Sequence, residues 1–204
     1  MDNTLSVSER KMVFNLENIE TRSPRLNTIL MLEDFIKKKS GELKKTALFL
    51  QLPKRIMWGT FNVILKYLWD NNKIGIDKDG YIVYIWNPET AVKFINRKTA
   101  SSVIFIEDSM ENEFLLLTEN NWLKKSILKT MSDLKENIFC GKNIAKRLIP
   151  IYYAKKYGIN NAWWYPLPNG WRLIYSILTP SKTEIIAGIL EFMNHKNYER
   201  RFSY

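Results

Sequence analysis

The chain has 204 residues, of which 46% are hydrophobic and 13% aromatic, and this composition supports packed cores and excludes an intrinsically disordered chain. Its 31 Lys and Arg residues outnumber its 21 Asp and Glu residues, and the net charge of +10 favours a polyanionic partner. With one histidine and one cysteine, the chain cannot form an intrachain disulfide and lacks the residues of a His/Cys zinc site.

We therefore expect neither a metal nor a cofactor. No apolar run approaches the roughly 18 residues that a membrane-spanning helix needs, and the N-terminus lacks the apolar segment of a signal peptide. A cytoplasmic protein that does not contact the membrane is the expectation. The cysteine, Cys140, precedes Gly141 in a loop-like stretch without a visible acid–base partner, so we expect an unreactive thiol.

The first 22 residues are polar with scattered apolar side chains, and we interpret them as an N-terminal arm or a short helix. Ser23 and Pro24 predict the start of a helix, because serine caps helices well and proline suits the first turn. Apolar residues then recur at helical spacing until Ser40-Gly41 breaks the pattern. A second, short helix is predicted over residues 42–50.

Pro53 is predicted to open a third helix. One side of this helix is apolar at helical spacing from Met57 to Leu68. The opposite side carries three polar residues and a tryptophan: Arg55, Trp58, Asn62 and Lys66. Such a two-sided helix is expected to bury one face and to present the other to a partner.

Residues 74–76 and 81–86 are predicted strands, and the turn residues 77–80 join them into a hairpin. Three helices followed by a hairpin over residues 23–86 resemble a winged helix domain. The resemblance implies that the third helix enters the DNA major groove and that the hairpin is the wing. The candidate DNA contacts are then Lys54, Arg55, Trp58, Asn62 and Lys66 near the third helix and Lys78 in the hairpin turn.

Winged helices also serve as protein-interaction modules, so a second interpretation stays open. In it, the exposed face of the third helix is a dimer interface with Trp58 at its centre. The partners expected from this part of the chain are therefore double-stranded DNA or a second copy of the chain.

Residues 87–99 have the composition of a connector, and we place a domain boundary between residues 96 and 97. The chain is thus divided into an arm (1–22), a winged helix domain (23–96) and a second domain (97–204). The second domain is predicted to begin with a strand over residues 102–106, followed by a long helical region.

A further helical segment is predicted over residues 144–157, bent at Pro150 and capped by Gly158. Three strands follow over residues 162–165, 171–178 and 184–193, because these stretches are rich in aromatic and branched side chains.

The stretch 170–177, the apolar run 185–193 and the sequence His195-Lys196-Asn197-Tyr198 resemble the last strands and the C-terminal tail of RelE-type toxins. The order of strand, two helices, antiparallel strands and tail is similar to that of the RelE/ParE superfamily. The fold expected for the chain is therefore α+β, with an N-terminal winged helix-turn-helix followed by a RelE-like domain.

RelE-type ribonucleases cleave mRNA without a metal, and cationic groups stabilise the charged transition state. The resemblance implies that Arg172 would hold the scissile phosphate, that Tyr198 would serve in proton transfer or base stacking, and that His195 and Lys196 form the basic pair that opens the tail. Glu199 departs from the pattern, because a carboxylate beside Tyr198 repels phosphate. ParE-type relatives share the fold without being ribonucleases.

Three functions follow from these features. The leading one is a DNA-binding protein, a transcriptional regulator, whose RelE-like domain serves assembly or a second nucleic-acid contact. The alternatives are a metal-independent endoribonuclease that acts on mRNA, with RNA or the ribosome as partner and a toxin–antitoxin context, and a protein-interaction module without a nucleic-acid ligand. On balance, these residues favour a binding protein over an enzyme.

Overall fold

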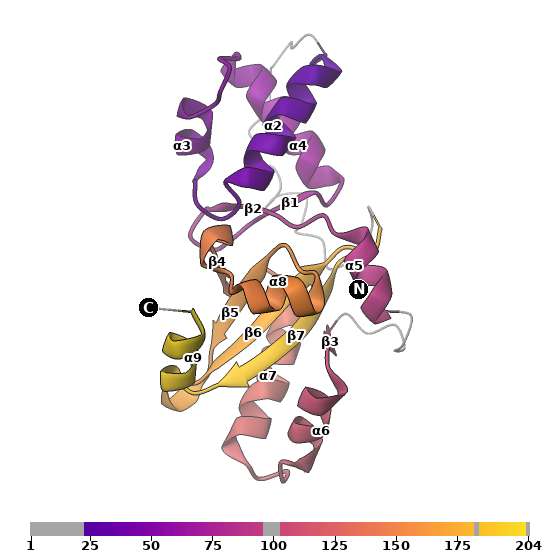
Figure 1. Ribbon diagram of the computed structural model, residues 1–204, viewed down its shortest axis with the longest axis vertical. Helices are drawn as coiled ribbons and strands as arrows, with labels where there is room; N and C mark the ends of the chain where they lie inside the picture. The colour runs from indigo at the N-terminus through magenta and orange to yellow at the C-terminus, as the bar shows by residue number, and fades with distance from the viewer. Residues whose placement is uncertain (1–22, 96–102, 182–183, 203–204) are drawn as a thin grey trace.

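The computed structural model describes residues 23–95, 103–181 and 184–202 (Figure 1). The arm predicted for residues 1–22 lies outside these ranges, as do residues 96 and 97 on either side of the predicted boundary. Residues 88–95, which that boundary assigned to the first domain, form a helix that packs on the large sheet of the second unit. The described chain is a mixed α+β structure with two sheets, which confirms the predicted class.

The N-terminal unit consists of helices and a small antiparallel sheet: α2 (Leu26–Lys38), α3 (Lys45–Leu50), α4 (Trp58–Asp70), β1 (Ile74–Ile76) and β2 (Ile82–Tyr84). The segment between α2 and α3 also pairs with the hairpin. Gly41 N–H donates to the Ile82 carbonyl at 2.9 Å, and Ile82 N–H donates to the Leu43 carbonyl at 3.1 Å. The hairpin is therefore anchored by its own unit along the outer side of β2.

Two predicted helix starts were wrong by a few residues. Helix α2 begins at Leu26 after Arg25, and α4 begins at Trp58 after Met57, rather than at Pro24 and Pro53. Both flanking residues have extended backbone, with ψ of 145° at Arg25 and 146° at Met57. A residue with an extended backbone cannot be part of a helix. Each helix therefore begins after its extended residue, and the proline lies in the preceding loop.

The C-terminal unit is built on a five-stranded sheet in the order β3-β7-β6-β5-β4, in which β3 is parallel to β7 and the other pairs are antiparallel. Its strands are β3 (Val103–Phe105), β4 (Lys142–Ile144), β5 (Ala162–Pro166), β6 (Arg172–Leu178) and β7 (Ile186–Met193). Its helices are α5 (Pro88–Ile95), α6 (Asp108–Leu116), α7 (Trp122–Glu136), α8 (Ile151–Tyr157) and α9 (His195–Phe202), with short 3-10 turns at Lys146–Leu148 and Pro168–Gly170.

The helix predicted over residues 144–157 was wrong in its first half. Ile144 is the last residue of the edge strand β4, and Lys146–Leu148 form a 3-10 turn. Helix α8 starts directly after Pro150, because proline cannot donate the hydrogen bond that a continuous helix needs. Gly158 closes α8 with a φ of 68°, the left-handed conformation expected of a C-terminal cap.

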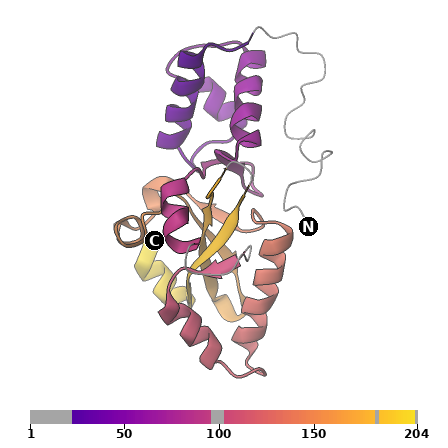
Figure 2. The ribbon, with the colours of Figure 1, turned by 90° about the vertical axis from the view of Figure 1, so that its right-hand side faces the viewer.

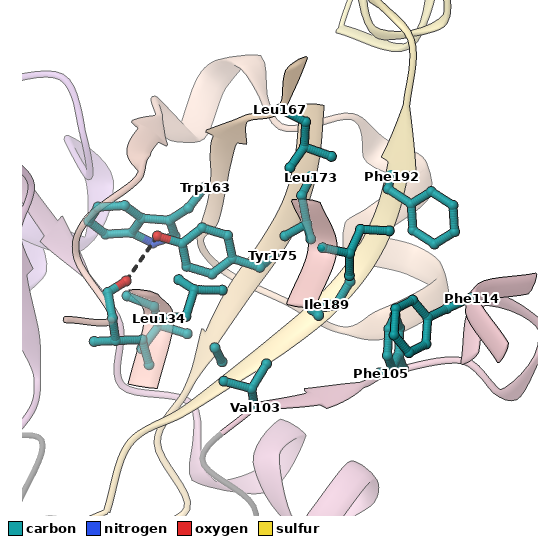
Figure 3. Packing of buried hydrophobic residues seen from close by; sticks show 14 of the residues in the cluster. Val103, Phe105, Phe114, Leu134, Trp163, Leu167, Leu173, Tyr175, Ile189 and Phe192 are labelled. Atoms are coloured by element: carbon teal, nitrogen blue, oxygen red, sulfur yellow. Dashed lines mark hydrogen bonds between the residues drawn. The ribbon is translucent and has the colours of Figure 1, made fainter. Parts of the chain in front are cut away.

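Helices cover both faces of the large sheet (Figure 2). On one face, Leu173 and Tyr175 of β6 pack with residues of α6 and α7, and Figure 3 shows this core from close by. On the other face, Ile174 packs with tyrosines of α8 and α9. Successive side chains of a strand point to opposite faces of the sheet, so alternate residues of β6 pack into two different cores.

The two units meet at Phe139, in the loop after α7. Its ring lies 5.8 Å from the Trp69 ring in the N-terminal unit and 5.7 Å from the Trp163 ring in the large sheet, measured between centroids. A Cβ added to Gly75 of β1 would come within 2.4 Å of the Phe139 ring, so only glycine permits this approach. Phe139 thus packs against both cores.

Hydrogen bonds also join the two units just before α5. The Asn87 amide, just before α5, donates to the Ile177 carbonyl at 2.9 Å, and its oxygen accepts from Thr179 N–H at 2.8 Å. Asn160 donates to the Trp86 carbonyl at 2.9 Å. Because Asn87 and Thr179 are buried, these bonds also satisfy polar groups that would otherwise cost free energy.

Replacing Phe139 by Ala should lower the free energy of unfolding by about 2 kcal/mol, less than the roughly 3–5 kcal/mol of a fully buried phenylalanine. Urea denaturation measures the loss, and Leu116→Ala, on a side chain 85% exposed, should change stability by less than about 0.5 kcal/mol. Hydrogen exchange should quicken in β1 and in β5 alike, and faster exchange in one of these strands alone would contradict the bridging role.

Candidate nucleic-acid interface

The start of α3, the loop between α3 and α4 and the first residue of α4 carry cationic and aromatic side chains, which we call the α3–α4 face: Lys44, Lys45, Lys54, Arg55 and Trp58. Lys54 and Arg55 are exposed, and neither forms an ion pair within the described chain. The Trp58 ring is 44% exposed; it meets the Phe49 ring edge-on at 4.9 Å, and the Lys45 ammonium lies 5.4 Å from its centroid. Packing thus holds the tryptophan in one orientation.

The N-terminus of α4 adds partial positive charge to this face. Met57 precedes the helix and makes no side-chain capping hydrogen bond, and the first turn holds no acidic residue. The first amide N–H groups of a helix lack intrahelical acceptors and carry the positive end of the helix dipole. Together with Lys54 and Arg55, they favour an anionic group such as a phosphate.

Two of the predicted contacts on α4 do not join this face. Asn62 is 3% exposed and lies among the buried residues of the helix, so the expectation that it faces a partner was wrong. The buried stripe of α4 is wide enough to include it, because Phe61 and Leu65 flank it. Lys66 is exposed but forms an ion pair with Asp70, one turn along the helix.

Lys78 lies apart from the α3–α4 face. It is exposed in the β1–β2 turn, but its neighbours face the large sheet: Asp77 accepts a hydrogen bond from Asn143, and Asp79 pairs with Lys142 at 3.3 Å. The tip of the hairpin is therefore attached to β4. The hairpin thus points toward the C-terminal unit.

The residues predicted from the RelE resemblance come together in part. The Arg172 guanidinium carbon lies 3.8 Å from the Tyr198 ring centroid and 4.6 Å from that of Trp164. No hydrogen bond or ion pair joins this guanidinium to another described residue, and Glu191 of the neighbouring strand β7 binds Arg201. Two rings orient Arg172 while its N–H donors remain available.

Tyr198 and His195 are less suited to proton transfer. Tyr198 is 1% exposed, and its ring stacks on Phe202 at 4.5 Å. His195 is exposed, and its Nδ1 lies 3.3 Å from a Glu199 carboxylate oxygen. Lys196 is exposed at the start of α9, outside the contact between Arg172 and the rings.

The sequence interpretation missed that residues 195–202 form a helix. Tyr198 and Phe202 are four residues apart and face the same core, a spacing that predicts a helix but is short enough to overlook. It also missed an aromatic and cationic cluster on α8: the Tyr152 ring lies 5.0 Å from the Arg201 guanidinium carbon and 5.2 Å from the Lys156 ammonium. The spacing of residues along the sequence does not predict that α8 and α9 lie side by side.

Neither a metal site nor a membrane-spanning helix is found in the described ranges. Within residues 23–95, 103–181 and 184–202, no group of three or more His, Cys, Asp or Glu side chains is placed to hold a metal ion, and no helix has the length and apolarity to cross a membrane. A scan against protein-family models, a search of curated proteins and a search of solved structures each found no match.

Cys140 is held as a thiol. Burial raises its pKa to about 11, and the nearby Asp133 carboxylate acts in the same direction. At pH 8, iodoacetamide should alkylate it on the order of 100-fold more slowly than an ordinary exposed thiol such as glutathione, because only the thiolate reacts. The rate should rise about tenfold per pH unit up to about 11, as mass spectrometry can follow. A rate that levels off near pH 9 would contradict the raised pKa.

Proposed function

We propose that the chain is a DNA-binding protein that contacts a duplex with its α3–α4 face. The observation that carries the proposal is the combination of Lys54, Arg55 and Trp58 with the uncapped N-terminus of α4. The order of three helices and a hairpin, with the segment after α2 paired to the hairpin, agrees with a winged helix arrangement.

Duplex DNA suits this face better than a small anion does. A major groove about 12 Å wide admits a helix, and phosphates flank it on both sides. With α4 directed at the groove by its N-terminus, Lys54 and Arg55 would lie near one strand's phosphates. Lys44 and Lys45 at the start of α3 would add further contacts of the same kind, independent of base sequence.

The attached hairpin changes how such a protein would bind. Because Asp77 and Asp79 bind residues of β4, the hairpin tip is engaged with the protein itself. We therefore propose that duplex binding depends on the α3–α4 face and that Lys78 contributes little. The C-terminal unit would serve assembly or an additional contact.

The double variant Lys54→Ala/Arg55→Ala should weaken duplex binding roughly tenfold at 0.1 M salt. It should also lower the slope of log K against log salt by about 2, because each lost phosphate contact removes about 0.9 of a released counterion. Fluorescence anisotropy with a labelled duplex across a salt series measures both quantities.

A matched control removes two positive charges elsewhere. Lys125 and Lys129 are exposed on α7, at the opposite end of the molecule from α3 and α4 (Figure 1). Lys125→Ala/Lys129→Ala should leave the salt slope within experimental error. Equal slopes for the two double variants would assign the binding to net charge alone and reject the α3–α4 face.

A second candidate function, a metal-independent endoribonuclease, is favoured by one observation. Two aromatic rings orient Arg172, and its N–H groups have no acceptor in the described chain. An arginine that binds a phosphate needs such free donors. Burial of Tyr198 and the contact between His195 and Glu199 weigh against it, because the proton transfers then lack an open acid or base.

The DNA-binding proposal expects no cleavage of free or ribosome-bound RNA. The ribonuclease candidate expects cleavage that persists with chelators and leaves a 2′,3′-cyclic phosphate. Arg172→Ala would then lower the rate on the order of 100-fold, the effect of removing one preorganised stabilising group, whereas Lys125→Ala would not. Mapping of RNA ends by mass spectrometry separates the two functions, with circular dichroism to show that the Arg172 variant is folded.

A further inference from the structure

A pocket of about 230 Å³ lies between α6, the end of β7 and α9. Its apolar wall consists of Met110 from α6 and of Phe192 and Met193 from the last residues of β7. Phe192 and Met193 belong to the cores on opposite faces of the sheet, so the wall is fixed by packing on both sides.

The polar wall contains a neutralised ion pair. Glu191 accepts a hydrogen bond from the Tyr153 hydroxyl at 3.0 Å and pairs with the Arg201 guanidinium at 3.1 Å. The Glu191 side chain is 14% exposed, and it compensates the positive charge of Arg201. These two residues therefore contribute no net charge to the pocket.

Arg200 supplies the remaining charge. Within the described chain, its guanidinium donates one hydrogen bond, to the neutral Asn197 amide oxygen at 3.4 Å, and both residues line the pocket. The acidic residue next to it, Glu199, faces His195. The pocket thus combines one uncompensated guanidinium, an amide and an apolar wall.

We propose that this pocket binds a small monoanionic carboxylate with a flat apolar body, a function beyond the proposed binding of DNA. The single net charge matches a monoanion, and a guanidinium offers a carboxylate two parallel hydrogen bonds. The second negative charge of a phosphate dianion would have no further unpaired cation to compensate it among the residues that line the pocket. The volume is below the roughly 300–1,000 Å³ of sites for drug-sized ligands, so the ligand has the size of a benzoate.

The test uses 4-fluorobenzoate and the full chain, with binding followed by fluorine NMR of the probe. Wild-type protein should give saturable binding, and the neutral 4-fluorobenzamide should bind at least tenfold more weakly. Arg200→Gln should weaken binding of the carboxylate by about 10- to 100-fold, the range for a hydrogen bond between charged groups. Arg147→Gln removes the same charge from an exposed site outside the pocket and should bind like the wild type.

A second variant tests the location. Asn197 is exposed at the pocket edge, so Asn197→Trp should fold normally and fill the space, with binding abolished. Absence of saturable binding to the wild type, equal binding of the two probes, or unchanged binding in Arg200→Gln or Asn197→Trp would each overturn the proposal. None of these measurements involves DNA, so their failure would leave the proposed function untouched.

Discussion

The contact of Phe139 with two cores is the constraint on which the arrangement of the chain depends. One ring packs on Trp69 of the N-terminal unit and on Trp163 of the large sheet, and Gly75 leaves the space for it. Aromatic rings bury large apolar areas with little loss of side-chain freedom, so a single phenylalanine can add to the packing of both units at once. The hydrogen bonds of Asn87 then fix the other side of the junction.

This orientation decides which surfaces are open to a partner. The hairpin tip faces β4, where Asn143 donates a hydrogen bond to Asp77 and Lys142 forms an ion pair with Asp79. The α3–α4 face lies at the end of the molecule remote from the sheet (Figure 1). A duplex could therefore approach it without meeting the C-terminal unit, which is in keeping with the DNA binding proposed for this face.

The three arginines near α9 illustrate how surroundings give one residue type different roles. Arg172 lies against two rings, Arg201 is paired with Glu191, and Arg200 lines a pocket and donates a hydrogen bond to the neutral Asn197 amide. A guanidinium keeps its charge in all three settings, so the neighbours alone determine what it can bind. We expect an anion where the charge is uncompensated and a structural role where it is paired.

Local patterns in the sequence determined much of the secondary structure. Branched and aromatic side chains predicted β5, β6 and β7, turn residues predicted the β1–β2 hairpin, and Gly158 predicted the end of α8, because each depends on neighbours a few residues away. Lys54, Arg55 and Trp58 could also be predicted as exposed, from the polar side of one helix and the loop before it.

Only the tertiary structure decided the burial of Asn62 and Tyr198, the attachment of the hairpin to β4 and the pairing of Glu191 with Arg201. These features join residues from separate elements or depend on how wide a face each helix buries. Periodicity along one element predicts that a face exists. It cannot predict which other element covers that face, because that choice depends on the packing of all elements together.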